Sequence, residues 1–329
     1  MLMVPQSAGA AENARGDFEF VTPIFHIAIK HGDLFVADAG QGVVLFDQRS
    51  GKPDSLVASL PGVTDVAPYS VGAMHAITGG PASKLYRVVD GNVKLVADLG
   101  AFEADVNPDG GEIDSNPFSV AALSGRRALV ADAAANALLN VSRSGHVDWV
   151  ATLPEQLVPT RNAKRLAGCP DAEPDLAEIC DLPRRIPAQP VTTSVAVGPD
   201  GAYYVGELKG LPALLNKSRI WRIEPGTRHA ECGSSPDCSV VARGFTSIVD
   251  LSFRRDGSLQ VVEIDEASWL AVELGQATLG TVSSCDLGSG ACDVLAELPI
   301  PVGVASTRRH VFSTTLSLVP GEADVVKIA

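Results

Sequence analysis

The sequence predicts an all-β fold, a six-bladed β-propeller of four-stranded antiparallel blades. Two observations carry this prediction: a pair of short β-rich runs joined by a turn recurs along the chain, and further β-rich runs follow each copy. Units of roughly 45 to 55 residues with four short strands each are typical of propeller blades. The 329 residues are 46% hydrophobic and 20% charged, which fits a globular chain with a sizeable core.

The recurring pair of runs is clearest in two copies, over residues 23–38 and 117–132, in which a proline opens the unit and an aspartate closes it. Two more copies, 194–207 and 251–263, carry an Asp-Gly turn between the runs, which indicates a β-hairpin. Weaker copies occupy 70–78 and 302–315. The chain therefore contains six units.

The last unit has no visible fourth strand, and we expect residues 18–21 (FEFV) at the other end of the chain to supply it. A strand shared between the two ends closes the ring and leaves no free sheet edge. A β-sandwich or a parallel β-helix is the competing fold, but its repeats would be less regular or shorter. Residues 17–329 are predicted to form one domain, with an insertion at about 155–190 that holds what little helix the sequence suggests.

The six cysteines form three close pairs, and none of the pairs has the C-x-x-C spacing of a zinc or redox site. The pairs are Cys169 with Cys180, Cys232 with Cys238, and Cys285 with Cys292. Three local disulfides predict an oxidising compartment, so the protein is expected to be secreted or periplasmic. Residues 1–16 are interpreted as an export-signal remnant or a disordered tail, because small residues resemble a cleavage site.

A formal net charge of −13 and a pI near 4.9 exclude a nucleic-acid partner, since the chain would repel a phosphate backbone. No run of about 18 apolar residues occurs, so the sequence predicts no membrane span. The expected partner is a small molecule or a protein, and the expected state is a monomer.

Two segments carry a family resemblance. Residues 96–118, which contain NPDGGEIDSNPF, and residues 193–208 (TSVAVGPDGAYYVGEL) resemble characteristic segments of the ScyD/ScyE propellers. That family is related in fold to NHL-repeat, gluconolactonase-like and strictosidine-synthase-like propellers. The resemblance implies a propeller and, through some members, an association with an extracellular pigment pathway. It implies no defined activity.

Polar residues stand where second strands end and first strands begin, positions that converge around a propeller axis. They are Asp38, Asn116, Asp132, Thr193, Glu207 and Glu263. Such a mouth could bind a ligand or hold a hard cation through oxygen atoms. The alternative is that Asp38 and Asp132 accept hydrogen bonds from the loops that follow them.

A second candidate site is local in the sequence. Oxygen-bearing side chains alternate ahead of glycines, as at the start of a calcium loop, at Asp105, Asn107, Asp109, Glu112 and Asp114. Asn116 stands where a calcium loop has its bidentate glutamate, and a proline interrupts the loop. The competing interpretation is an acidic turn held by its own hydrogen bonds.

These patterns favour an exported propeller that binds or scaffolds a small molecule or protein at the acidic mouth. The alternative is a metal-dependent, lactonase-like hydrolase or lyase that uses the mouth carboxylates. Ca²⁺ or another divalent cation is the cofactor suggested, and no organic cofactor is indicated. No catalytic residue is assigned, because the six histidines are scattered; His75 is expected on an inner strand, where it would face the channel or the core.

Overall fold

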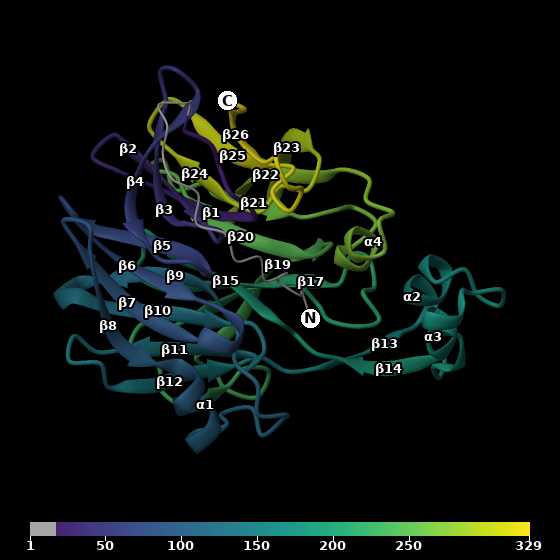
Figure 1. The fold of residues 1–329 in the computed structure, drawn as a ribbon. Coiled ribbons are helices and arrows are strands. Elements are labelled where there is room, and N and C mark those ends of the chain that lie inside the picture. Colours follow the sequence, from purple (N-terminus) through teal and green to yellow (C-terminus); the bar gives the residue numbers. More distant parts are fainter. Residues whose placement is uncertain (1–17) are drawn as a thin grey trace.

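A computed structural model describes residues 18–329 and confirms the six-bladed propeller (Figure 1). Each blade is an antiparallel meander whose first strand lies nearest the common axis. The first three blades are β1 (Ile24–Lys30), β2 (Asp33–Asp38), β3 (Gly42–Asp47) and β4 (Lys52–Ser59); β5 (Val63–Ser70), β6 (Ala73–Thr78), β7 (Lys84–Val89) and β8 (Asn92–Asp98); and β9 (Pro117–Leu123), β10 (Arg127–Asp132), β11 (Ala137–Val141) and β12 (Val147–Thr152).

The last three blades follow the same order. They are β15 (Thr192–Val197), β16 (Tyr203–Glu207), β17 (Ser218–Ile223) and β19 (Cys238–Phe245); β20 (Ile248–Phe253), β21 (Leu259–Glu263), β22 (Gly280–Asp286) and β23 (Ala291–Leu298); and β24 (Val304–Ser306), β25 (Val311–Thr315) and β26 (Asp324–Lys327). Short helices lie in the connections: η1 (Gly80–Ala82), α1 (Leu99–Val106), η2 (Ser124–Arg126) and α4 (Trp269–Glu273).

The sixth blade has three strands in the described part of the chain, and residues 18–21 form no strand there. This corrects the expectation for that segment. Its two phenylalanines, Phe18 and Phe20, instead pack against the apolar cluster shared by blades 1 and 6. The backbone N–H of Ile24 donates to the carbonyl of Ser317 at 3.0 Å, which joins the first strand of the ring to the last blade. The export-signal interpretation of 1–16 lies outside the described residues.

The core lies between neighbouring blades. Side chains alternate between the two faces of a strand. One face of each blade is covered by the preceding blade and the other by the following blade, so the strands read as near-continuous apolar runs. Leu129 and Leu138 of blade 3, for example, share one buried cluster with Val205 and Trp221 of blade 4. This blade-to-blade packing fixes the positions of the strand ends that form the mouth.

His75 is buried on β6, the second strand of blade 2, and not on an inner strand as expected. It packs against Tyr69, with ring centroids 4.8 Å apart. Burial, with the nearby charge of Arg87, lowers the pKa of His75 to about 4. A neutral imidazole in this apolar setting is a core residue.

An arm projects from the ring between blades 3 and 4 (Figure 1). Its base is a two-stranded hairpin of β13 (Gln156–Pro159) and β14 (Arg185–Ala188). Beyond the hairpin lie α2 (Arg161–Leu166), η3 (Pro174–Leu176) and α3 (Ala177–Asp181), and the Cys169–Cys180 disulfide closes this segment. The helix α2 packs back against the ring through Ala163 and Leu166. No helix within residues 18–329 is long and apolar enough to cross a membrane.

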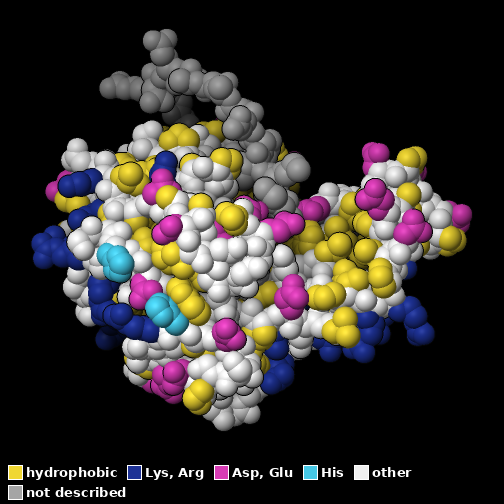
Figure 2. All heavy atoms as spheres, turned by 90° about the horizontal axis from the view of Figure 1, so that it is seen from below, with side chains coloured by type: hydrophobic (Ala, Val, Ile, Leu, Met, Phe, Trp, Pro, Cys, Tyr) yellow, Lys and Arg dark blue, Asp and Glu magenta, His cyan; other side chains and the backbone are white. Residues whose placement is uncertain are grey.

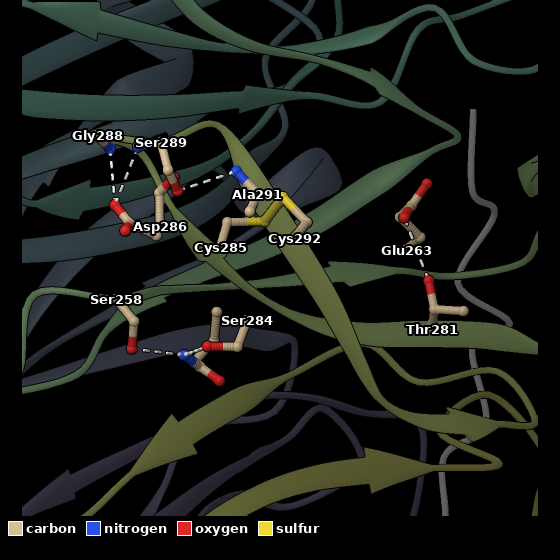
Figure 3. Close-up of a disulfide and its surroundings, with 11 residues drawn as sticks. Ser258, Glu263, Thr281, Ser284, Cys285, Asp286, Gly288, Ser289, Ala291 and Cys292 are labelled. Atoms are coloured by element: carbon tan, nitrogen blue, oxygen red, sulfur yellow. Dashed lines mark hydrogen bonds between the residues drawn. A yellow bond between two sulfur atoms is a disulfide. The ribbon is translucent and has the colours of Figure 1, made fainter.

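The other two predicted disulfides are also present. Cys285 and Cys292 face each other across β22 and β23 (Figure 3), as expected for a hairpin. Cys232 and Cys238 close a different feature, because the connection between β17 and β19 leaves blade 4 and adds a short parallel strand, β18 (Ala230–Glu231), to the edge of β12. This excursion links blades 3 and 4 on their outer side.

Candidate functional site

The predicted mouth residues lie on one face of the ring, at the ends of second strands and, for Asn116 and Thr193, at the starts of first strands, but their partners are local. Asp38 accepts hydrogen bonds from the N–H groups of Val21 and Gly40 and from Gln41. Asp132 accepts bonds from the Ser115 hydroxyl at 2.6 Å and from the N–H of Asn116 at 2.7 Å. Burial raises the pKa of both carboxyls, and these bonds partly offset it.

Glu207 has a different environment, because two cations contact it. The Arg219 guanidinium binds both carboxylate oxygens, and the Lys209 ammonium lies 3.1 Å from Oε2. The Trp221 indole N–H also points to Oε2, at 3.4 Å. Lys209 is 1% exposed, and burial together with Arg219 lowers its pKa to about 8. The position of Glu207 at a strand end was predictable, whereas its cationic partners were not.

Glu263 lies at the corresponding place in blade 5 and is held separately. It accepts hydrogen bonds from the N–H of Thr246 and from the Thr281 hydroxyl, the latter at 3.2 Å and visible in Figure 3. Burial, reinforced by Glu266, raises its pKa to about 7. The Thr193 hydroxyl donates to the carbonyl of Ile248, and Asn116 accepts from the N–H of Gly80. Each predicted mouth residue therefore has partners in its own or the adjacent blade.

The predicted calcium loop begins at Asp105 in the last turn of α1 and is held by several internal bonds. Asp109 accepts from the N–H of Gly111 and from the Asn136 amide, both at 2.8 Å, and Asn107 donates to the carbonyl of Gly111. Asp105, Glu112 and Asp114 are exposed. Across residues 18–329, no three His, Cys, Asp or Glu side chains are gathered closely enough to hold a metal ion.

Glu103 on α1, which sequence reasoning missed, lies beside this loop. It is 2% exposed, and neither carboxylate oxygen has a hydrogen-bond partner. Burial, followed by the charges of Asp132 and Asp109, raises its pKa to about 7. Only its place one helical turn ahead of the acidic loop could have indicated it.

Three buried ionisable side chains at the axis were also missed. His26 of β1 lies 3.6 Å from Asp65 of β5 and 3.9 Å from Asp250 of β20, and its Nε2 is 3.0 Å from the carbonyl of Val249. Burial alone would lower the pKa of His26, but the two carboxylates outweigh it and raise the pKa. Asp65 and Asp250 also accept the N–H groups of Val120 and Val304 in the following blades. This group ties the blades together at the centre.

A cavity of about 750 Å³ opens between blades 3 and 4 on the same face as the mouth. Its lining comes from the calcium-like loop, the β10–β11 turn, the end of β12, the entry to β15 and the β18 excursion. Three carboxylates, Asp109, Glu155 and Glu231, line it, and no Lys, Arg or His does. We call it the acidic pocket. Of the predicted site residues, only Asp109 belongs to it.

Asn136 organises this pocket. Its amide donates to Asp109, its side-chain oxygen accepts from the N–H of Val191, and its backbone carbonyl accepts from Leu153. One side chain thus holds the acidic loop, blade 3 and the start of blade 4 together. No pattern in the sequence distinguishes this asparagine from others in turns.

The protein is thus a six-bladed propeller with a pocket of ligand size beside its mouth. Comparison with solved structures gives the same fold. A protein of unknown function from Bacteroides thetaiotaomicron has a TM-score of 0.59 at 10% identity, covering 96% of this chain and 70% of that one. A PQQ-bound aldose sugar dehydrogenase from Streptomyces coelicolor has a TM-score of 0.55 at 12% identity, over 98% and 99% of the chains.

Virginiamycin B lyase from Staphylococcus aureus is similar as well, with a TM-score of 0.50 at 13% identity over 94% of this chain and 87% of that one. At these identities the likeness shows the fold alone. No family model and no curated protein matches the chain, so the ScyD/ScyE resemblance has no support from these comparisons.

Proposed function

We propose that this protein is an exported binding propeller whose acidic pocket takes a small cationic ligand. The observation that carries the proposal is the lining of the pocket, in which Asp109, Glu155 and Glu231 surround a cavity of about 750 Å³ without a basic side chain. A cavity of this size lies within the range of small-molecule sites, roughly 300 to 1,000 Å³. The carboxylates around it favour a positively charged occupant, and the charge of Lys209 acts on one of them, Glu155.

Export is part of the proposal because three disulfides close within the described chain. The ScyD/ScyE resemblance of residues 96–118 and 193–208 also supports export, since some members of that family are associated with an extracellular pathway. The lactonase-like alternative requires several ligands around one ion, whereas Glu207 is already neutralised by Lys209 and Arg219. Binding is therefore the function that the site supports best.

Calorimetric titration with spermidine, a flexible organic cation, tests the proposal. The double variant Glu155→Gln, Glu231→Gln removes two lining charges and should weaken binding about tenfold or more, as expected for charge-assisted contacts. The matched control is Asp293→Asn, Glu297→Gln, which removes two exposed charges from β23. Absence of spermidine binding to the parent, or equal weakening in both double variants, would reject an organic cation as the ligand.

Titration with Ca²⁺ tests the divalent-cation form of the proposal. A ligand that binds only the native state raises stability by mass action, so Ca²⁺ should raise the melting temperature and a chelator should reverse the rise. The change Asp105→Ala, Asp109→Ala should abolish that response if the predicted loop holds the ion. An unchanged response in the variant would place the ion elsewhere, and no response in the parent would leave the loop an acidic turn.

A further inference from the structure

A second cavity, about 340 Å³, lies at the base of the arm and has the opposite charge. Three cations line it: Arg161 from the start of α2, Arg185 from β14, and Lys217 from the loop between β16 and β17. No Asp or Glu lines it. We call it the basic pocket.

The cations of the basic pocket are not neutralised by the protein. Within residues 18–329, no carboxylate forms an ion pair with Arg161, Arg185 or Lys217. One Arg185 nitrogen donates to the carbonyl of Leu157 at 3.1 Å, which orients the guanidinium beside the cavity. All three side chains are exposed, and they gather at one cavity in a chain whose net charge is −13. An anion in the cavity would interact favourably with each of them.

Apart from Gln156, the rest of the wall is apolar. Leu157, Val158 and Pro159 of β13 face the cavity together with Leu214. Leu157 is 58% exposed, so part of this wall is open to solvent. Figure 2 shows hydrophobic side chains on the arm with Lys and Arg side chains gathered along one of its edges. The cavity therefore presents a cationic part beside an apolar part.

The two sides of the basic pocket are fixed relative to each other. The buried Asn162 amide donates to the carbonyl of Ala213 in the β16–β17 loop and to the Ser268 hydroxyl beside α4. The base of the arm is thus bonded to the loop that carries Leu214 and Lys217. A preorganised cavity loses less conformational entropy on binding than one that must assemble.

We propose that the basic pocket binds a small organic anion, a carboxylate or phosphate carried on an apolar group. The anion would contact Arg161, Arg185 and Lys217, and the apolar group would lie along Leu157, Pro159 and Leu214. Its volume, near the lower end of the range for small-molecule sites, fits a compact ligand better than a folded partner. This site is independent of the acidic pocket and would bind its ligand whether or not the acidic pocket binds a cation.

Calorimetric titration with octanoate tests this proposal. The double variant Arg161→Gln, Lys217→Gln should bind octanoate about tenfold more weakly or worse than the parent. The control Lys94→Gln, Arg309→Gln changes the net charge equally at exposed sites on blades 2 and 6 and should bind as the parent does. Melting temperatures of all variants verify that they fold.

Two further probes separate charge from apolar contact. 1-Octanol keeps the chain of the probe without the charge, and inorganic phosphate keeps charge without the chain, so both should bind the parent more weakly than octanoate. The proposal is overturned if octanoate does not bind the parent, if it binds the double variant unchanged, or if octanol or phosphate binds as tightly as octanoate.

Discussion

Lys209 and Arg219 place two cations against the carboxylate of Glu207, which is fully buried. Replacing Glu207 by Gln should destabilise the protein by about 3 to 5 kcal/mol, because buried charges lose their partner. Glu224→Gln is the control, since Glu224 pairs with Arg222 at the exposed surface and its loss should cost about 1 kcal/mol or less. Urea unfolding measures both, and similar losses would show that the buried network contributes no more than a surface pair.

Glu103 predicts a pH dependence. In the folded protein this carboxyl keeps its proton up to a pH of about 7, whereas in the unfolded chain it loses the proton near its ordinary value of 4.5. The folded state binds more protons between these values, so this group lowers the free energy of unfolding as the pH rises through them.

Glu103→Gln removes that dependence. From pH 5 to pH 8, the free energy of unfolding of the variant should rise relative to the parent by about 1 to 2 kcal/mol. Denaturant titrations at the two pH values measure it, with Glu112→Gln as an exposed control on the loop that follows α1. A difference between variant and parent that does not change with pH would mean that Glu103 is ionised in the folded protein throughout this range.

At the scale of elements, the arm has a disulfide of its own in addition to its contacts with the ring, where Ala163 and Leu166 join the buried core cluster. The Cys169–Cys180 disulfide joins two residues that are 11 positions apart in the sequence. The double change Cys169→Ser, Cys180→Ser should speed trypsin cleavage after arm residues such as Lys164 and Arg184, while the melting temperature changes by less than about 3 °C. The double change Cys285→Ser, Cys292→Ser should lower the melting temperature and leave trypsin cleavage of the arm unchanged, because Cys285 is buried within blade 5. Equal trypsin sensitivity of the two variants would show that the Cys169–Cys180 disulfide does not protect the arm from local opening.

The sequence predicts an element well when neighbouring residues determine it, and poorly when contacts between distant segments determine it. The hairpin of β9 and β10 was predictable because Pro117 and Asp132, which end opposite each other, recur at the spacing of the first unit. The ends of the second strands followed from the same repeat. By contrast, β18 pairs with β12 across a separation of roughly eighty residues, and no turn or alternation within either segment indicates that contact.

The same distinction applies to the candidate site. Asp38 and Asp132 brace their own turns, as one interpretation of the sequence expected, because an aspartate at a strand end bonds the next few N–H groups. The acidic pocket needs the excursion at Glu231, the loop at Asp109 and the end of β12 brought together by blade packing. The sequence shows which residues each of these segments contains, but no local pattern shows that the segments come together.

At the scale of the whole molecule, ring closure depends on how closely blades 1 and 6 approach. A Cβ atom on Gly303 would lie 2.7 Å from the carbonyl oxygen of Phe25 and 2.9 Å from the Cα of His26. Gly303→Ala should therefore lower the free energy of unfolding by about 3 kcal/mol, since backbone atoms on both sides must move.

Gly100→Ala is the matched control for this substitution. A Cβ atom there meets its nearest neighbour, the Cβ of Ser83, at an ordinary 3.5 Å, and alanine favours the helix α1. Its effect should stay within about 1 kcal/mol of zero. Chemical denaturation compares the two, and a Gly303→Ala protein as stable as the control would show that the junction between the first and last blades is not tightly packed.

The arm has a consequence for how this architecture can be varied. Because Gln156 pairs with Ala188, the chain leaves the ring and returns to it at neighbouring points. The roughly thirty residues between them form an insertion. Replacing them with a short linker would remove the buried contacts of Ala163 and Leu166 but no blade strand. Deletion or exchange of that insertion would alter the basic pocket and leave the six-bladed ring continuous. The ligand bound at the arm can therefore change without a change in the blades.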